Sequence, residues 1–184
     1  MTRSNLVRWF AAFLGALAVS VSTAHATDIG GTISTTLTIT EDSQLADDVT
    51  CTVTGAPCIA IGAPHVTLEL NGFTMTGQAD PQTGCGVGVT PDAAASAILV
   101  QTQSDVTIHG PGLIQRFLGY GINIRRVSTG VRVIGVTLST NCYSGVFVSG
   151  CATSPCVAGA SSLNEISHNV IVRNGNPAAP CGGI

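Results

Sequence analysis

The chain has no lysine, few charged residues and few aromatic rings. Charged residues make up 9% of its 184 residues and aromatic residues 4%, whereas hydrophobic residues make up 45%. A disordered chain would carry far more charge, so this composition excludes disorder. The net charge of −3 and the pI of about 5.7 exclude a typical nucleic-acid-binding domain, which is basic. The scarcity of rings also excludes a platform on which bases stack.

Glycine, threonine and valine are abundant instead. The chain contains 22 Gly, and Thr and Val recur in short segments that are typical of β-strands. The length corresponds to one domain. We therefore expect a single globular domain of β structure with no nucleic-acid partner.

The N-terminal segment, residues 1–26, has the layout of a secretory signal peptide. Arg3 and Arg8 supply a positive start, an apolar run follows at residues 9–21, and residues 24–26 form a small-x-small cleavage signal. The apolar run is too short for a bilayer core of about 30 Å, and no later run is long enough to span one. Cleavage after Ala26 predicts a secreted or periplasmic domain, residues 27–184, with no membrane span.

The charges of this predicted mature domain are segregated along the chain. Residues 27–105 hold nine acidic residues and no basic one. Residues 106–184 hold five arginines and a single acidic residue, Glu165. The domain is therefore acidic in its first half and basic in its second.

All seven cysteines lie in the predicted mature domain, as expected of a chain that matures in an oxidising compartment. Cys51 and Cys58 enclose one short loop and Cys151 and Cys156 another, and we take these four as disulfide candidates. Spacing alone does not determine the pairing. We expect no metal site, because the sequence has no C-x2-C and no His-x3-His. The odd count leaves one thiol over, unless its partner lies outside this chain.

Short units of the form Gly-apolar-x-apolar recur through the chain. Ile98, Ile122 and Val146 occupy equivalent positions in three of them and are evenly spaced. Leucine-rich repeats share this period, but their Leu/Asn consensus is absent. A fixed period in the twenties is typical of solenoids, in which coils stack about 4.8 Å apart. Related units are found at residues 58–61, 86–89 and 183–184.

Each unit is followed by two more short apolar segments that alternate with polar residues. Such alternation predicts strands with Val, Ile and Leu inside and Thr, Asn, Ser and Arg outside. Longer spacings predict insertions at residues 80–83, 151–160 and 177–180, and such loops often carry binding function. The second segments are residues 66–68, 106–108, 131–133 and 164–166, and the third are 73–75, 113–114, 136–138 and 170–172.

Two stretches carry a resemblance to a known family. Residues 164–174 follow the pattern Asn-x-Ile-x-x-Asn-x-Ile-x-x-Asn, and residues 66–77 have the sequence V-T-L-E-L-N-G-F-T-M-T-G. Both resemble repeats of exported, pectate-lyase-like right-handed parallel β-helix proteins, and the resemblance covers about residues 33–184. It implies an all-β right-handed parallel β-helix, a solenoid with about 24 residues per coil. It also implies asparagine ladders at the turns, with roles for Asn141 and Asn174.

The catalytic motifs of that superfamily are not found here. Asp47-Asp48 precedes the repeats, and His109-Gly110 lacks the preceding Gly of the polygalacturonase-like G-H-G motif. The D-P-H segment of alginate-epimerase-like members is absent. The acidic cluster of Glu41, Asp42, Asp47 and Asp48 is far in sequence from any arginine, and we interpret it as a solvated turn rather than a calcium site.

Aligning the predicted second strands suggests two side-chain pairs. Arg132 falls beside Glu165, both pointing outward, and we interpret them as a surface ion pair. Glu69 and His109 share a column, in which a carboxylate would orient an imidazole for acid–base chemistry. The long stretch of sequence between Glu69 and His109 leaves room for an intervening coil.

The arginines are the stronger functional candidates. Arg116, Arg125 and Arg132 fall on strands or turns of adjacent coils, and a groove lined by guanidinium groups would hold uronate carboxylates. Phe147, with Tyr143 nearby, is the best-placed ring for sugar stacking. The alternative is that outward arginines only keep a Thr/Ser-rich surface soluble.

Two functions remain open, and neither implies a cofactor. In the first, the chain is an exported, non-catalytic β-helix that contacts an anionic polysaccharide or a cell surface. In the second, it is the N-terminal part of a polysaccharide lyase, hydrolase or epimerase. We expect the chain to be truncated at its C-terminus, because Gly183-Ile184 begins a coil and solenoids require a polar cap.

Overall fold

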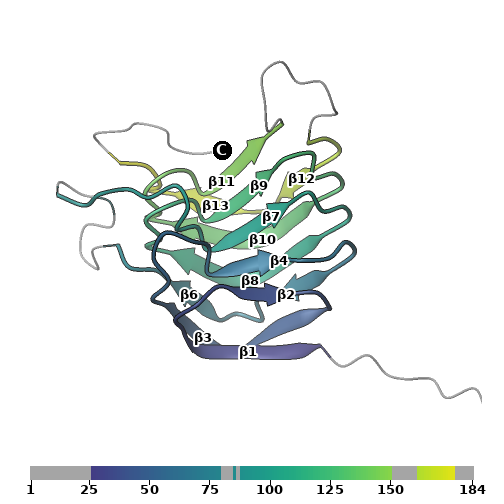
Figure 1. The fold of residues 1–184 in the computed structure, drawn as a ribbon, viewed down its shortest axis with the longest axis horizontal. Helices are drawn as coiled ribbons and strands as arrows, with labels where there is room; N and C mark the ends of the chain where they lie inside the picture. Colours follow the sequence, from purple (N-terminus) through teal and green to yellow (C-terminus); the bar gives the residue numbers. More distant parts are fainter. Residues whose placement is uncertain (1–25, 80–84, 86–87, 151–160, 177–184) are drawn as a thin grey trace, which may run out of the picture.

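The computed structural model describes residues 26–79, 85, 88–150 and 161–176. Within these ranges the chain forms β-strands and no helix, and each strand pair is parallel (Figure 1). The strands are β1 (Thr27–Ile33), β2 (Leu37–Ile39), β3 (Ser43–Cys51), β4 (Ile59–Ile61), β5 (Thr67–Glu69), β6 (Thr74–Thr76), β7 (Ile98–Gln101), β8 (Thr107–Gln115), β9 (Ile122–Arg125), β10 (Arg132–Ser139), β11 (Val146–Ser149), β12 (Glu165–Ser167) and β13 (Val170–Val172).

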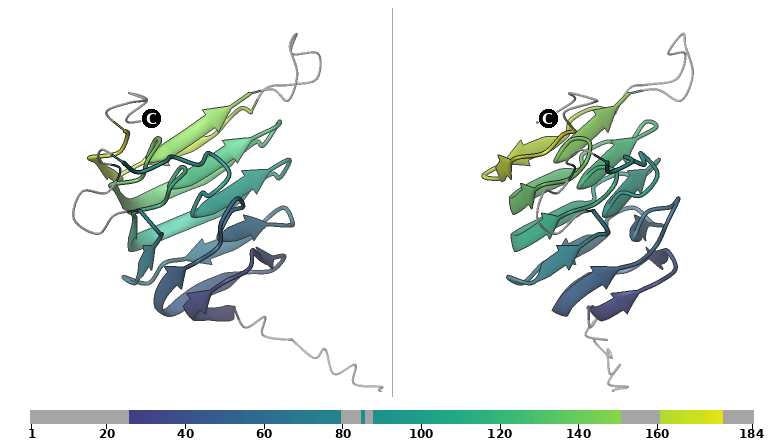
Figure 2. Two further views of the ribbon diagram at one scale, coloured as in Figure 1. Left: turned by 60° about the vertical axis from the view of Figure 1, so that its left-hand side comes forward. Right: turned by 90° about the vertical axis from the view of Figure 1, so that its left-hand side faces the viewer.

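The strands form two sheets, and the chain passes back and forth between them. Sheet B is five-stranded in the order β11-β9-β7-β4-β2. Sheet A contains the other eight strands: six follow the order β1-β3-β5-β8-β10-β12, while β6 pairs with β3 and β8, and β13 pairs with β10. Each passage adds one layer, so that position along the sequence becomes height in the stack (Figures 1 and 2). The expected all-β class with parallel sheets is confirmed.

The register confirms the predicted repeat. Ile98 pairs with Ile122, and Ile122 pairs with Val146, in sheet B. In sheet A the short strands β5 and β6 pair with the two halves of β8, and β12 and β13 pair with the two halves of β10. Each predicted second and third segment therefore overlaps a strand, which in several cases begins one residue later.

Other predictions about the repeat units and insertions are either wrong or concern residues outside the described ranges. The unit at residues 86–89 forms no strand at Gly88 and Val89, and its first two residues lie outside the described ranges. The predicted insertions at 80–83, 151–160 and 177–180 and the unit at 183–184 also lie outside them. The resemblance placed the repeats from about residue 33, whereas β1 begins at Thr27 and pairs with β3.

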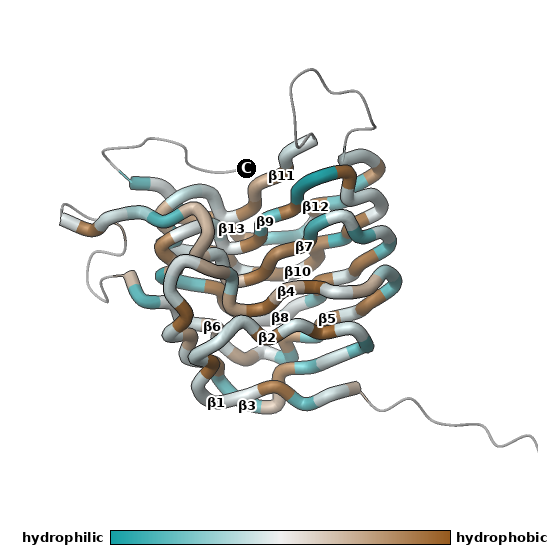
Figure 3. Tube along the Cα trace, viewed as in Figure 1, coloured by the Kyte–Doolittle hydropathy of each residue, from teal (hydrophilic) through white to brown (hydrophobic). Residues whose placement is uncertain are grey.

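The core runs the length of the stack between the sheets. Side chains alternate along each strand, so Ile122 and Ile124 of β9 point inward and are fully buried, as are Ile108 of β8 and Val133 of β10. Hydrophobic and polar residues accordingly alternate along the strands (Figure 3). Burying each such side chain contributes about 1.5–3 kcal/mol, so the stacked aliphatic columns supply the main driving force for folding.

Asparagines join successive layers at the turns. Oδ1 of Asn174 accepts a hydrogen bond from the backbone N–H of Asn141 at 3.0 Å, and its Nδ2 donates to the carbonyl of Leu138 at 3.0 Å. Asn169 makes the same pair of bonds to Val136 and Val133. Backbone groups at a turn lack ladder partners, so the amide side chain replaces the missing strand. The predicted link between Asn141 and Asn174 is confirmed, at 2.9 Å between their side chains.

Candidate functional site

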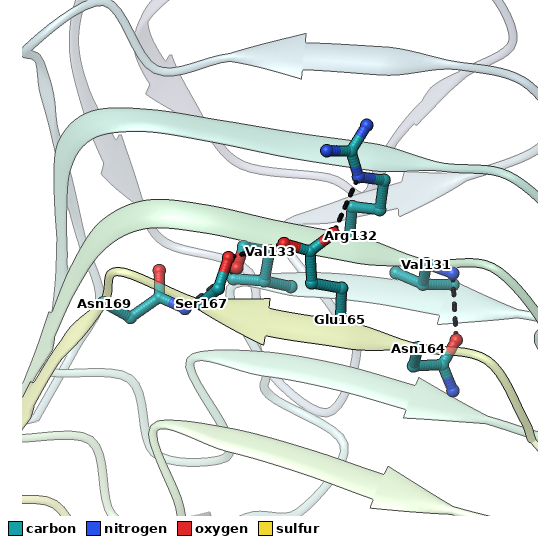
Figure 4. Close-up of polar contacts among 7 residues, drawn as sticks. All are labelled: Val131, Arg132, Val133, Asn164, Glu165, Ser167 and Asn169. Atoms are coloured by element: carbon teal, nitrogen blue, oxygen red, sulfur yellow. Dashed lines mark hydrogen bonds and ion pairs between the residues drawn. The ribbon is translucent and has the colours of Figure 1, made fainter.

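The outer face of sheet A carries charged side chains that pair with one another. Arg132 and Glu165 are direct neighbours in register, and Nε of Arg132 donates to Oε2 of Glu165 at 3.1 Å (Figure 4). Glu69 and His109 are neighbours in the same way, with Nδ1 of His109 2.8 Å from Oε2 of Glu69. No layer intervenes between β5 and β8, so both predicted pairs are confirmed.

Glu165 is further stabilised as a carboxylate. The hydroxyl of Ser167 donates to its Oε1 at 2.7 Å. This hydrogen bond, together with the one from Arg132, lowers the pKa of Glu165 below its usual value. The carboxylate of Glu165 and the guanidinium of Arg132 are therefore already paired with each other. Because solvent screens such an exposed pair, it contributes little to stability.

Two carboxylates of the acidic cluster near the N-terminus accept hydrogen bonds from backbone N–H groups. Oδ1 of Asp42 accepts the N–H of Thr67 at 2.7 Å, and Oδ1 of Asp48 accepts the N–H of Thr74 at 2.8 Å. Asp47 and Asp48 lie within β3, so the interpretation of the cluster as a turn is wrong for these two residues. Among the described residues, no group of three or more His, Cys, Asp or Glu side chains is placed to hold a metal ion.

The predicted groove of three arginines is not formed. Arg132 pairs with Thr107 at the start of β8, whereas Arg116 follows the end of that strand. Arg125 is the last residue of β9, in the other sheet. The three arginines are close in sequence, but two lie at opposite ends of paired strands in sheet A and the third lies in sheet B. Sequence spacing alone did not reveal this separation.

A groove does lie along the outer face of sheet B. Its larger part has a volume of about 510 Å³, within the usual range of small-molecule sites. In register, Phe147 lies beside Asn123 and Ser149 lies beside Arg125. Two of the four predicted site residues, Arg125 and Phe147, therefore share this groove. It is lined by Ala93, Ala94, Tyr120, Asn123, Arg125, Phe147 and Ser149.

Aromatic rings form a stacked cluster in this groove. The rings of Tyr120 and Phe147 stack with centroids 4.5 Å apart and an interplanar angle of 16°. Tyr143, which the sequence also indicated, lies against Tyr120 with centroids 5.1 Å apart. Sequence reasoning missed Tyr120, although it precedes Tyr143 by nearly one full repeat. The cluster offers an apolar surface with polar edges.

Within the described part of the chain, two polar atoms in the groove are buried without a partner. These atoms are Oδ1 of Asn123, a residue that is only 2% exposed, and Nε of Arg125. A buried acceptor or donor without a partner costs about 1–3 kcal/mol, more for a charged group. A ligand that supplied a donor to Asn123 and an acceptor to Arg125 would recover this cost. Nε of Arg116 is also without a partner, but Arg116 lies where the chain leaves sheet A.

Disulfides brace the walls of the groove. Two of the four disulfide candidates, Cys51 and Cys58, form a disulfide with each other, with Cα atoms 6.0 Å apart, and it closes the turn that contains Ala56 and Pro57. A second disulfide, Cys85–Cys142, joins residues 57 positions apart and ties the segment before β7 to the turn that carries Tyr143. Sequence reasoning missed it because distant cysteines give no pairing signal. Cys151 and Cys156 lie outside the described residues.

The loop before β7 packs directly on the turn before β9. The N–H of Asp92 donates to the carbonyl of Leu118 at 2.8 Å, and the N–H of Gly119 donates to the carbonyl of Ala95 at 3.0 Å. A Cβ at Gly119 would lie 2.6 Å from the carbonyl oxygen of Asp92, so only glycine permits this approach. The wall formed by Ala93 and Ala94 is thereby held against sheet B.

A separate cavity of about 270 Å³ lies between β1 and β2. Its apolar lining of Ile29, Ile33, Leu37 and Ile39 is the inner, core-facing side of the first layer. Its polar rim is satisfied internally, because the hydroxyl of Thr27 donates to Glu41 at 2.6 Å. Unlike the groove on sheet B, it combines no ring with an unpaired polar atom, and we do not assign a site there.

Comparison with known proteins gives no match: no family model, no curated protein and no solved structure matches the chain. Among the described residues, none belongs to a helix with the length and apolar character needed to cross a membrane.

Proposed function

We propose that this chain is a right-handed parallel β-helix of the pectate-lyase-like type that binds an anionic polysaccharide in the groove on sheet B. The two parallel sheets, which the chain visits alternately, and the stacked layers with asparagines at their turns support the β-helix. A pair of stacked rings beside an arginine supports the ligand class, since rings pack on sugar faces and guanidinium pairs with carboxylates.

One observation carries the binding proposal. Arg125 Nε and Asn123 Oδ1 are buried and unpartnered in the groove that holds Tyr120 and Phe147. The equivalent charged groups on sheet A have partners. A uronate residue would place its carboxylate on Arg125 and its ring against the aromatic cluster.

Export to an oxidising compartment is part of this proposal. Both disulfides within the described residues are buried in or near the core, where Cys58 and Cys142 are fully inaccessible. Disulfides of this kind persist outside the cytosol. Together with the predicted signal peptide, they support a secreted or periplasmic protein.

A second candidate function rests on the contact between Glu69 and His109. At 2.8 Å, the carboxylate orients the imidazole through Nδ1 and leaves Nε2 for a substrate proton. The pair would then serve acid–base chemistry in a polysaccharide lyase, hydrolase or epimerase. The side chains of His109 and Glu69 are 47% and 39% exposed on a sheet face, away from the groove, which favours binding over catalysis.

Calorimetric titration of the purified protein with uronate oligosaccharides tests the binding proposal. We expect saturable binding that Arg125→Gln weakens about tenfold or more, because a hydrogen bond to a charged group is worth about 1.5–3 kcal/mol. Arg132→Gln is the matched control, since it removes the same charge from sheet A, and it should leave the affinity unchanged. Equal affinities for wild type and Arg125→Gln would refute the site. Release of unsaturated or shortened products, abolished by His109→Gln, would favour the enzyme instead.

A further inference from the structure

The groove on sheet B has two adjoining compartments. The first, the aromatic compartment, is the part of about 510 Å³ that contains Tyr120 and Phe147. The second, the alanine compartment, has a volume of about 150 Å³ and lies toward the earlier strands of sheet B. The two share four lining residues, Ala93, Ala94, Asn123 and Arg125. The alanine compartment is completed by Gly55, Ala56, Pro57, Ser96 and Leu99.

The alanine compartment is small and mostly apolar. Ala56, Pro57 and Leu99 present hydrocarbon to it. Its other polar groups are already engaged: the carbonyl of Pro57 accepts from the hydroxyl of Thr36 at 2.7 Å, and the hydroxyl of Ser96 donates to the carbonyl of Ala93 at 3.4 Å. Among the described residues that line this compartment, the atoms left unpaired are the acceptor Oδ1 of Asn123 and the donor Nε of Arg125, both at the border with the aromatic compartment.

This combination requires a ligand group with a hydrogen-bond donor directly beside a small apolar group. An acetamido substituent has both, because its N–H is separated from its methyl group by one carbonyl carbon. An O-acetyl group has the methyl but no donor. A free hydroxyl has the donor but nothing to fill the apolar space. An ammonium group would lie close to the guanidinium of Arg125, which repels it.

We propose, building on the proposed polysaccharide function, that the groove selects a glycan in which an N-acetylated aminosugar adjoins a uronate. The acetamido N–H donates to Oδ1 of Asn123 and its methyl group enters the alanine compartment. The carboxylate of the adjoining uronate pairs with Arg125. Asn123 and Arg125 are two residues apart on β9, so their side chains are separated by about 7 Å, the scale of one sugar ring.

Two tetrasaccharides distinguish this inference from the broader function. One alternates glucuronate with N-acetylglucosamine, and the other alternates glucuronate with glucose, so that they differ only in the acetamido group. We expect the wild-type protein to bind the first about tenfold more tightly, from one buried methyl group and one hydrogen bond to an otherwise unpaired acceptor. Equal affinities would overturn the acetamido preference and leave the polysaccharide function intact. Failure to bind either would refute both.

Substitutions of residues that line the alanine compartment test whether this compartment causes the preference for the acetamido group. Ala94 is exposed, so Ala94→Leu should fold normally and fill the compartment. We expect it to lose the preference and to bind the two tetrasaccharides with equal affinity. Asn123→Leu should show the same loss of preference. Ala60→Leu, on the same sheet outside the groove, is the matched control and should keep it. A preference that survives in Ala94→Leu and Asn123→Leu contradicts the assignment.

Discussion

The outer faces of both sheets carry an arginine, but among the described residues the arginine of sheet A is paired with a carboxylate and that of sheet B is not. On sheet A, Arg132 lies beside Glu165 and the two form an ion pair. On sheet B, Arg125 lies beside Ser149 in the equivalent register, and its Nε has no partner. The face of sheet A is therefore complete in itself, whereas that of sheet B has unused hydrogen-bonding capacity.

The difference originates in what covers each face. The outer face of sheet A is formed by regular strands, and its charged side chains reach solvent and one another. Sheet B is bordered by turns of unequal length, which bury Asn123 and create the groove. A regular repeat thus provides the scaffold, while departures from the repeat provide the site. The following predictions test this contrast, beginning with the largest expected effect.

Removing the long-range disulfide should affect sheet B far more than sheet A. For Cys85→Ser/Cys142→Ser we expect a loss of unfolding free energy of about 4 kcal/mol, because the crosslink closes a long loop in the unfolded chain. Cys51→Ser/Cys58→Ser, which opens a short loop, should cost about 2 kcal/mol. Thermal unfolding measures both. Hydrogen exchange should rise most at residues 88–97 and 118–121 and least at Glu69 and Thr107, and a uniform rise would contradict the contrast.

Supplying Arg125 with an acidic neighbour should make sheet B resemble sheet A. In Ser149→Glu the new carboxylate stands where Glu165 stands beside Arg132, so it competes with the uronate. We expect the affinity for uronate oligosaccharides to fall at least about tenfold. Ser149→Gln is the isosteric control and should bind nearly as wild type. The reverse change, Glu165→Ser, should not create binding, because no groove surrounds Arg132.

Disrupting the other pair on sheet A should change little. Glu69→Gln removes a carboxylate from the contact with His109, which is 47% exposed. We expect a loss of unfolding free energy below about 1 kcal/mol in chemical denaturation, and no change in glycan affinity. A marked loss of glycan affinity would show that the two faces do not act separately.

The smallest effect concerns the protonation of Glu165. Its pKa in the folded protein is lowered by Ser167 and Arg132, so its stabilising contribution is full above the pKa of the unfolded chain and is lost as the pH falls through the lower, folded value. NMR titration should find the pKa of Glu165 higher in Ser167→Ala than in the wild type. An unchanged pKa would mean that the hydroxyl of Ser167 does not hold the carboxylate.

Regular positions were predictable because successive layers of the parallel sheets repeat their contacts. The even spacing of Ile98, Ile122 and Val146 predicted their register, and the alignment of the second strands brought Arg132 to Glu165. The contact between Asn141 and Asn174 was expected from the resemblance to β-helix repeats. Irregular positions were not predictable in this way. Arg116 and Arg132 were expected in one groove. They lie apart because the chain runs around the core, so that residues close in sequence can face different directions.

The sequence by itself determined the β class, the repeat, and which side chains meet on successive layers, because alternation and period depend only on local geometry. The tertiary structure decided that Cys85 joins Cys142 and that Asn123 is buried beneath the turns near Tyr120 and Phe147. It also decided that Arg125 is unpaired while Arg132 is paired. Burial and pairing depend on loops that do not repeat, and their packing against sheet B is a long-range property that no local pattern encodes.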